Sequence, residues 1–108
     1  MANQFFDADE IYLLQISNEP ETEIAIRVDE DDNCLRWFDS LRCRMTCGIK
    51  IKRNELQLEV RDSMDRILNF QPLSLSDYNK YIRDQLEGKP SFKTRKEMVD
   101  FFNNLGSW

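Results

Sequence analysis

The sequence has no histidine among its 108 residues, and this absence removes several kinds of site. Ser-His-Asp and Cys-His nucleophile chemistry, zinc binding through imidazole and pH switching near neutrality all need a histidine ring. Glycine is scarce too, and its three positions are too scattered for either standard phosphate-binding loop. No other nucleophile, general base or cofactor motif stands out. We therefore predict a non-catalytic protein without a cofactor or a metal ion.

Long hydrophobic runs are also missing. The longest uninterrupted apolar stretch covers residues 11–14, far short of the roughly 20 residues that span a bilayer. The first residues lack the basic and apolar regions of a secretory signal. Cysteine occurs three times, an odd number in a chain with enough apolar residues to build a core without disulfides. These features predict a cytoplasmic protein that keeps its thiols reduced and does not contact a membrane.

Two of the cysteines invite a comparison with zinc sites. The spacing of Cys43 and Cys47 is close to that of a zinc knuckle. Both residues nevertheless fall in a stretch predicted to be a straight strand, on the same apolar side as Met45 and Ile49. A free cysteine in such a position behaves as a small hydrophobic residue. The pattern therefore favours packing of Cys43 and Cys47 in the core over metal binding.

The chain has the length of one domain, which we expect to cover residues 1–108. Its clearest pattern has a period of two. Between residues 41 and 52 every odd-numbered position is apolar and every even-numbered position is polar, basic or glycine. Such alternation predicts a strand that buries its odd-numbered side. Residues 55–61 alternate as well, and a two-residue turn at 53–54 would pair Ile49 with Leu58 and Cys47 with Val60.

Residues 23–28 and 35–37 form a second predicted hairpin. A turn at residues 31–32 would place Val28 opposite Leu35, and a short connection at 39–41 would place Leu35 opposite Met45. Residues 11–17 and 66–71 complete the sheet as its first and last strands. The apolar residues of 34–45 also have helical spacing, which leaves a helix there as an alternative.

The period changes after Pro72. Ser74 and Asp77 have the spacing of a helix N-cap, and Thr94 and Glu97 form a capping box. Apolar residues at helical spacing follow each signal and predict helices at about 74–87 and 94–105. The expected fold is α+β: an antiparallel meander of five to six strands over residues 11–71, with both helices packed on one face. The predicted core comprises Ile24, Ile26, Val28, Leu35, Trp37, Met45, Ile49, Ile51, Leu56, Leu58, Val60, Ile67, Tyr78, Ile82, Met98 and Phe102.

Charge is distributed unevenly along this acidic chain, whose net charge is −5. Residues 1–33 carry ten acidic residues against one basic residue, whereas residues 34–66 carry eight basic residues against five acidic ones. Acidic and basic segments that lie side by side would neutralise each other. Surfaces of opposite sign that stay separate would instead attract a charged partner.

In the predicted registers the basic residues lie on the outward side of the sheet, with Arg27 and Arg44 on either side of Arg36. Like charges opposed across strands are unfavourable and need a compensating group. The acidic residues 7–10 could supply it, and so could a binding partner. We predict a partner-binding surface made of Arg27, Arg36, Phe38, Arg42, Arg44, Lys50 and Lys52.

The partner we expect is another protein, in which case the chain would serve as an adaptor, regulator or inhibitor. Single-stranded nucleic acid is the alternative, because basic sheet faces with an interleaved aromatic residue bind phosphates and stack bases. An isoelectric point near 4.7 and a lone aromatic residue on this face argue against nucleic acid. The sequence leaves the oligomeric state open.

Overall fold

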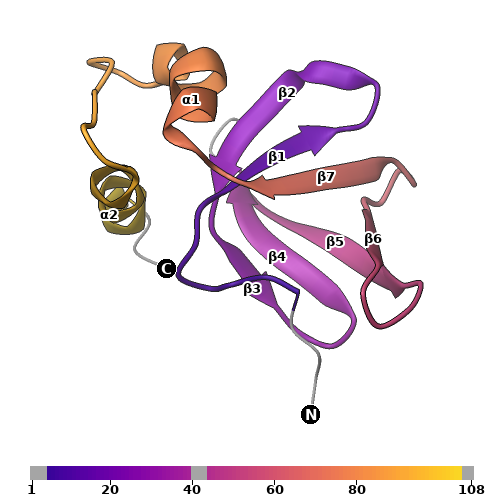
Figure 1. Ribbon diagram of the computed structural model, residues 1–108. Coiled ribbons are helices and arrows are strands. Elements are labelled where there is room, and N and C mark those ends of the chain that lie inside the picture. Colours follow the sequence, from indigo (N-terminus) through magenta and orange to yellow (C-terminus); the bar gives the residue numbers. More distant parts are fainter. Residues whose placement is uncertain (1–4, 40–43, 106–108) are drawn as a thin grey trace.

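The computed structural model describes residues 5–39 and 44–105 and shows one curled sheet with two helices beside it (Figure 1). All neighbouring strands are antiparallel, in the order β2-β1-β7-β6-β5-β4-β3. The strands are β1 (Tyr12–Ile16), β2 (Glu19–Ile26), β3 (Val28–Glu30), β4 (Cys34–Asp39), β5 (Arg44–Lys52), β6 (Leu58–Arg61) and β7 (Ile67–Pro72). The predicted α+β class is confirmed, but the sheet is larger than the five to six strands expected.

The sheet is nearly closed into a barrel. Its two edge strands, β2 and β3, are separated in the sequence by Arg27 alone. Before this residue the chain pairs with β1, where Tyr12 lies opposite Ile26, and after it the chain pairs with β4, where Val28 lies opposite Trp37. One continuous stretch of backbone therefore joins both edges of the sheet.

The inside of the barrel is one hydrophobic core. Alternate residues of β1 point into it, and the Trp37 ring lies near its centre, with an edge-to-face contact to Phe70 at 5.7 Å between ring centroids. Its buried members are Tyr12, Leu14, Ile16, Ile24, Ile26, Val28, Leu35, Trp37, Val60 and Leu68.

A second core lies outside the barrel, between β1, β2 and the helices. The first helical region comprises α1 (Leu75–Asp77), a π-helical turn (Tyr78–Ile82) and a 3₁₀ turn (Arg83–Gln85), and α2 (Arg95–Leu105) follows. Their apolar residues cover Ile11 and Leu13, the other side of β1. Both faces of β1 are thus buried, which explains the apolar run at 11–14. The helices cover only the β1–β2 side and leave β5 and β6 uncovered (Figure 1).

Both predicted helix starts are confirmed. The Ser74 hydroxyl accepts a hydrogen bond from the Asp77 backbone N–H at 3.1 Å, and the Thr94 hydroxyl accepts one from Glu97 at 3.2 Å. Only three residues of the first predicted helix are α-helical, because π and 3₁₀ turns follow directly. None of the helices in the described ranges is long and apolar enough to cross a membrane.

Strand β5 is turned over relative to the prediction. It was expected to place Met45 opposite Leu35 and Cys47 opposite Val60, but Gly48 lies opposite Leu35 and Lys50 opposite Val60. Each register differs by three residues, and an odd shift exchanges the two faces of a strand. The odd-numbered residues therefore point outward, and Met45 and Ile49 are each 56% exposed.

The space beneath Trp37 explains this orientation. A Cβ atom on Gly48 would lie 2.7 Å from Val60 Cγ1 and 3.2 Å from the Trp37 ring, so only a glycine fits there. Thr46, another small residue, lies opposite Trp37 itself. The large odd-numbered residues of β5 would overfill this interior. Small residues opposite large ones are typical of narrow barrels.

Other predicted registers are also corrected. Val28 lies opposite Trp37, not Leu35, because the turn is centred one residue later, with Asp31 N donating to Cys34 O. The loop from Arg53 to Gln57 is longer than the predicted turn. A helix at 34–45 is contradicted, since β4 occupies residues 34–39 and β5 begins at Arg44.

The core prediction is wrong for four residues and incomplete for others. Met45, Ile49, Leu56 and Ile67 are exposed. Ile51, Leu58 and Phe102 are half-buried, while the remaining nine predicted residues are buried. The buried residues that the prediction omitted are Ile11, Tyr12, Leu13, Leu14, Ile16, Leu68 and Leu73.

The orientation of β5 can be tested by two substitutions. Gly48→Ala forces a methyl group against Val60 and Trp37, and we expect it to lower the free energy of unfolding by about 1–3 kcal/mol. Met45→Ala truncates an outward side chain and should stay within about 0.5 kcal/mol of the wild type. Urea denaturation of both variants measures these values. A large loss for Met45→Ala together with a neutral Gly48→Ala would mean that β5 has the opposite face inward.

Candidate functional site

The residues predicted to form one basic surface are divided between the two sides of the sheet. Arg36 and Phe38 point outward from β4, where they are exposed. Arg44 and Lys50 share the inward-facing parity of β5, but Arg44 at the start of the strand is exposed, as is Lys52 at its end. Arg27 lies at the bend between β2 and β3, and Arg42 lies outside the described residues. Whether any of them binds a partner stays a prediction.

The predicted row of three arginines does not form. Arg36 lies opposite Asp29 and makes an ion pair with it at 2.8 Å, with both side chains more than half exposed. Asp39, not Arg36, lies opposite Arg44. The sheet therefore compensates Arg36 internally, and no row of like charges requires a partner to neutralise it.

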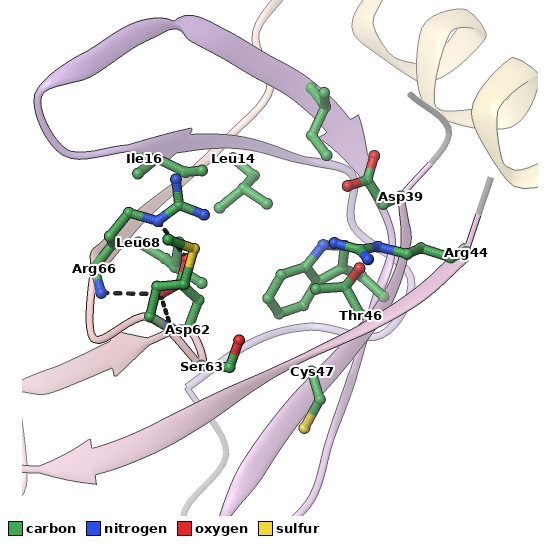
Figure 2. Close-up of a pocket in the computed structure, with 13 residues that line it drawn as sticks. Leu14, Ile16, Asp39, Arg44, Thr46, Cys47, Asp62, Ser63, Arg66 and Leu68 are labelled. Atoms are coloured by element: carbon green, nitrogen blue, oxygen red, sulfur yellow. Dashed lines mark hydrogen bonds and ion pairs between the residues drawn. The ribbon is translucent and has the colours of Figure 1, made fainter. Parts of the chain in front are cut away.

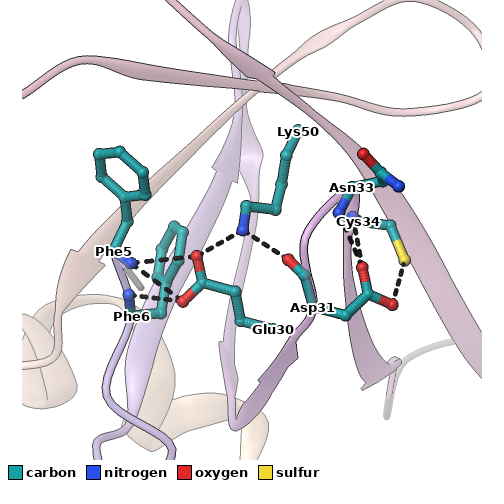
Figure 3. Close-up of polar contacts among 7 residues, drawn as sticks. All are labelled: Phe5, Phe6, Glu30, Asp31, Asn33, Cys34 and Lys50. Carbon is teal, nitrogen blue, oxygen red and sulfur yellow. Dashed lines mark hydrogen bonds and ion pairs between the residues drawn. The ribbon is translucent and has the colours of Figure 1, made fainter. Parts of the chain in front are cut away.

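Lys50 is buried at the end of the barrel where the chain enters β1. Its ammonium lies 2.8 Å from the Glu30 carboxylate, with the two side chains only 6% and 4% exposed, and it donates to the Asp31 carbonyl at 2.6 Å. The same carboxylate accepts hydrogen bonds from the Phe5 and Phe6 backbone N–H groups at 3.0 Å (Figure 3). Both charges are thus paired and hydrogen-bonded, as burial demands. Lys50 therefore closes this end of the barrel and is compensated within the chain.

The two lysines of β5 test this assignment. Lys50→Met leaves Glu30 as an uncompensated buried charge, which should lower the free energy of unfolding by about 3–5 kcal/mol. Lys52→Met is the matched control on the same strand and should change it by less than about 0.5 kcal/mol. Chemical denaturation provides both values, and equal effects of the two substitutions would contradict the buried pair.

The outer face of β4 and β5 carries exposed apolar side chains. Phe38 lies directly opposite Met45, and both are about half exposed, at 45% and 56%. Cys47 and Ile49 follow on the same side of β5. We name these four residues the outer apolar patch. Neither hydrophobic core includes any of them.

Ion pairs border the outer apolar patch on both sides. Arg36 and Asp29 lie along β4 and β3. On β6, the Glu59 carboxylate contacts Arg61 and Arg53, each at 2.7 Å, and these two guanidinium groups hold the pKa of Glu59 below its ordinary value. Aromatic, methionine and arginine side chains are enriched at protein interfaces. The composition of this face therefore resembles an interface more than an ordinary exposed strand.

Cys34 lies at the edge of the patch, beside the acidic turn. Its thiol donates a hydrogen bond to the Asp31 carboxylate at 3.2 Å (Figure 3). This bond, together with burial and the neighbouring Cys47, raises the pKa of Cys34 to about 11. The expected core position of the cysteines is contradicted for Cys47, which is exposed, while Cys34 is half-buried and Cys43 lies outside the described residues.

The raised pKa predicts slow alkylation of Cys34, because only the thiolate reacts. Its rate with iodoacetamide should keep rising with pH up to about 11, where half of the thiol is ionised. Asp31→Asn keeps the turn but removes the charged acceptor, so the pKa should fall and alkylation near pH 9 should accelerate by roughly tenfold for one pKa unit. Asp32→Asn is the control for loss of a nearby charge. Mass spectrometry of the Cys34 peptide measures each rate, and an equal effect of both substitutions would refute the role of Asp31.

A cavity of about 400 Å³ opens at the opposite end of the barrel from Lys50 (Figure 2). Its apolar wall consists of inner-core residues: Leu14, Ile16, Ile24, Trp37 and Leu68. Its polar rim comes from the end of β4, the start of β5 and the β6–β7 turn. The rim includes Asp39, Arg44, Thr46, Asp62, Ser63 and Arg66, and Cys47 and Met64 also border the cavity.

The β6–β7 side of this rim is held by its own hydrogen bonds. The Asp62 carboxylate accepts from the Arg66 guanidinium and backbone at 2.8 and 2.9 Å, and Arg66 also contacts Glu19 of β2 at 3.2 Å. Although burial opposes ionisation, hydrogen bonds from Arg66 and Met64 hold the pKa of Asp62 below its ordinary value. These charges are compensated within the turn.

The polar side chains on the β5 side of the rim, in contrast, lack partners within the described ranges. Figure 2 shows the Arg44 side chain reaching from β5 toward the cavity, and within the described ranges it takes part in no ion pair. The Thr46 hydroxyl is buried and has no hydrogen-bond partner in the same part of the chain. The exposed Arg44 and the buried Thr46 hydroxyl thus lie two residues apart on one side of β5, and neither side chain has a partner within the described ranges.

The described residues contain no group of three side chains that could hold a metal ion. No protein-family model, curated protein or solved structure matches the chain. Its function therefore has to be argued from the outer apolar patch and the cavity. Sequence patterns named Phe38 and Arg44 but missed both surfaces, because each depends on the orientation of β5. Thr46 and Gly48, the small residues within the alternating stretch, were the signal that could have indicated it.

Proposed function

We propose that this protein is a cytoplasmic, non-catalytic interaction module that binds another protein through the outer face of β4 and β5. The observation that carries the proposal is the exposure of Phe38, Met45 and Ile49 on the adjacent strands β4 and β5. The helices pack on the outer side of β1 and β2 and leave β5 uncovered (Figure 1). An adaptor, regulator or inhibitor needs such a surface and no catalytic group.

The expected energetic centre of this surface is apolar, with charge at its border. A partner that covers Phe38 and Met45 would remove apolar area from water, the main favourable term in protein association. The bordering ion pairs of Arg36 and Arg61 are already formed, so a partner would not have to neutralise them. This revises the expectation of binding through charged surfaces, since charge here would select the partner's orientation rather than supply most of the affinity.

Single-stranded nucleic acid stays the alternative. Phe38 and Arg36 are neighbours on the same face and could stack on a base and contact a phosphate. The other basic residues weaken this alternative, because Lys50 is buried and Arg36 and Arg61 are paired with carboxylates. Phosphate binding would have to break these pairs.

Site-specific photocrosslinking distinguishes the two partners. A benzoylphenylalanine introduced at position 45 should form adducts with a protein in cells that express the chain. The same group at position 56 is the control, because Leu56 is an apolar residue that is 90% exposed in the β5–β6 loop, away from the patch. Adding Ile49→Lys should remove the position 45 adduct without a change in the melting temperature, since Ile49 is 56% exposed.

Three outcomes would contradict the proposal. Equal adduct formation from positions 45 and 56 would mean that contact is unspecific. A position 45 adduct that nuclease removes, and that weakens steeply with salt, would support the nucleic-acid alternative. An adduct that survives Ile49→Lys would place the interface elsewhere on the chain.

A further inference from the structure

We propose that the cavity at the open end of the barrel binds a small amphipathic anion, namely a carboxylate attached to a compact apolar body. This inference does not depend on the outer apolar patch, because Phe38, Met45 and Ile49 do not line the cavity and only Cys47 of the patch borders it.

The cavity has the size and lining of a ligand site. Its volume of about 400 Å³ falls in the range of roughly 300–1,000 Å³ that small-molecule sites occupy. The wall formed by Leu14, Leu68 and the Trp37 ring would cover an aliphatic or aromatic body. A few polar groups above an apolar wall are the usual arrangement for fixing the orientation of a ligand.

The groups without acceptors determine the charge of the ligand. Arg44 reaches toward the cavity without an ion pair in the described ranges, and the Thr46 hydroxyl is buried without a partner (Figure 2). A buried hydroxyl without a partner is costly, so Thr46 at a cavity indicates a missing polar group. The guanidinium of Arg44, which is exposed, makes an anionic group the best match for both residues. A carboxylate between these two residues could accept from both, with the guanidinium supplying a charge-assisted bond.

The acidic groups of the rim do not reverse this conclusion. Asp62 is held by Arg66 and by backbone N–H groups. Asp39 is only 1% exposed and has a partner of its own. Arg44 is a charged group of the cavity lining that makes no ion pair within the described ranges, and its positive charge favours an anion over a cation.

The Trp37 ring provides the measurement, because it lines the cavity. A Trp108→Phe background leaves Trp37 as the only tryptophan. Titration with sodium octanoate should change its fluorescence saturably. The matched neutral probe, 1-octanol, should bind at least about tenfold more weakly, since it lacks the charge-assisted bond to Arg44.

Substitutions on one strand identify the anion-binding groups. Arg44→Gln should weaken octanoate binding about tenfold and leave 1-octanol binding unchanged. Arg44→Lys keeps the charge and should retain part of the preference for octanoate. Thr46→Val should weaken octanoate binding less than Arg44→Gln does. Lys52→Gln removes a positive charge from β5 away from the cavity and should have no effect.

Several results would overturn this inference. One is the absence of a saturable Trp37 signal with octanoate in the folded wild-type background. Equal affinities for octanoate and 1-octanol would contradict an anion-binding site. So would an Arg44→Gln variant that still prefers octanoate over 1-octanol. Ile49→Lys separates this inference from the proposed function, because it alters the outer apolar patch and should leave octanoate binding intact. Loss of octanoate binding in Ile49→Lys would mean that the probe binds the patch.

Discussion

Closure of the sheet through the bend at Arg27 is the constraint on which the rest of the structure depends. Because β2 and β3 form one stretch of chain, the sheet must curl until β1 and β4 are both within hydrogen-bonding reach of it. The interior of the barrel has little room where Trp37 and Val60 meet β5, which is why β5 presents Gly48 there. The orientation of β5, and with it both candidate surfaces, follows from this limit on volume.

Curling also decides where the helices go. A flat sheet has one face to bury, and both helices could have covered it. In the nearly closed sheet the inner face forms its own core, and the helices instead cover Ile11 and Leu13 on the outside of β1. They reach only part of the outer surface, and Met45 and Ile49 lie on the part left uncovered. An exposed apolar patch on this face is therefore a consequence of the topology and gives the chain a surface to use.

The two ends of the barrel differ in how far their charged and polar side chains are paired within the chain. At one end the Glu30 carboxylate forms an ion pair with Lys50 and accepts hydrogen bonds from the backbone N–H groups of Phe5 and Phe6. The buried charges there are therefore compensated within the chain. At the other end, beside the cavity, the Thr46 hydroxyl is buried without a partner and the exposed Arg44 makes no ion pair within the described ranges. Buried polar groups are rarely left unsatisfied without a reason. This contrast makes the second end the natural place for a ligand and the first end a structural plug.

The sequence by itself determined the class of the fold, the approximate positions of most strands and the starts of both helices, because alternation and capping are local signals. It did not separate β3 from β2, so the sheet has more strands than predicted. It could not determine which side of β5 faces inward. Large apolar residues alternate there with small and basic ones, and a change of three residues in two loops exchanges the faces at no cost to the pattern. Only the tertiary structure decided this, since the packing of Gly48 beneath Trp37 and the pairing of Lys50 with Glu30 join residues far apart in the chain.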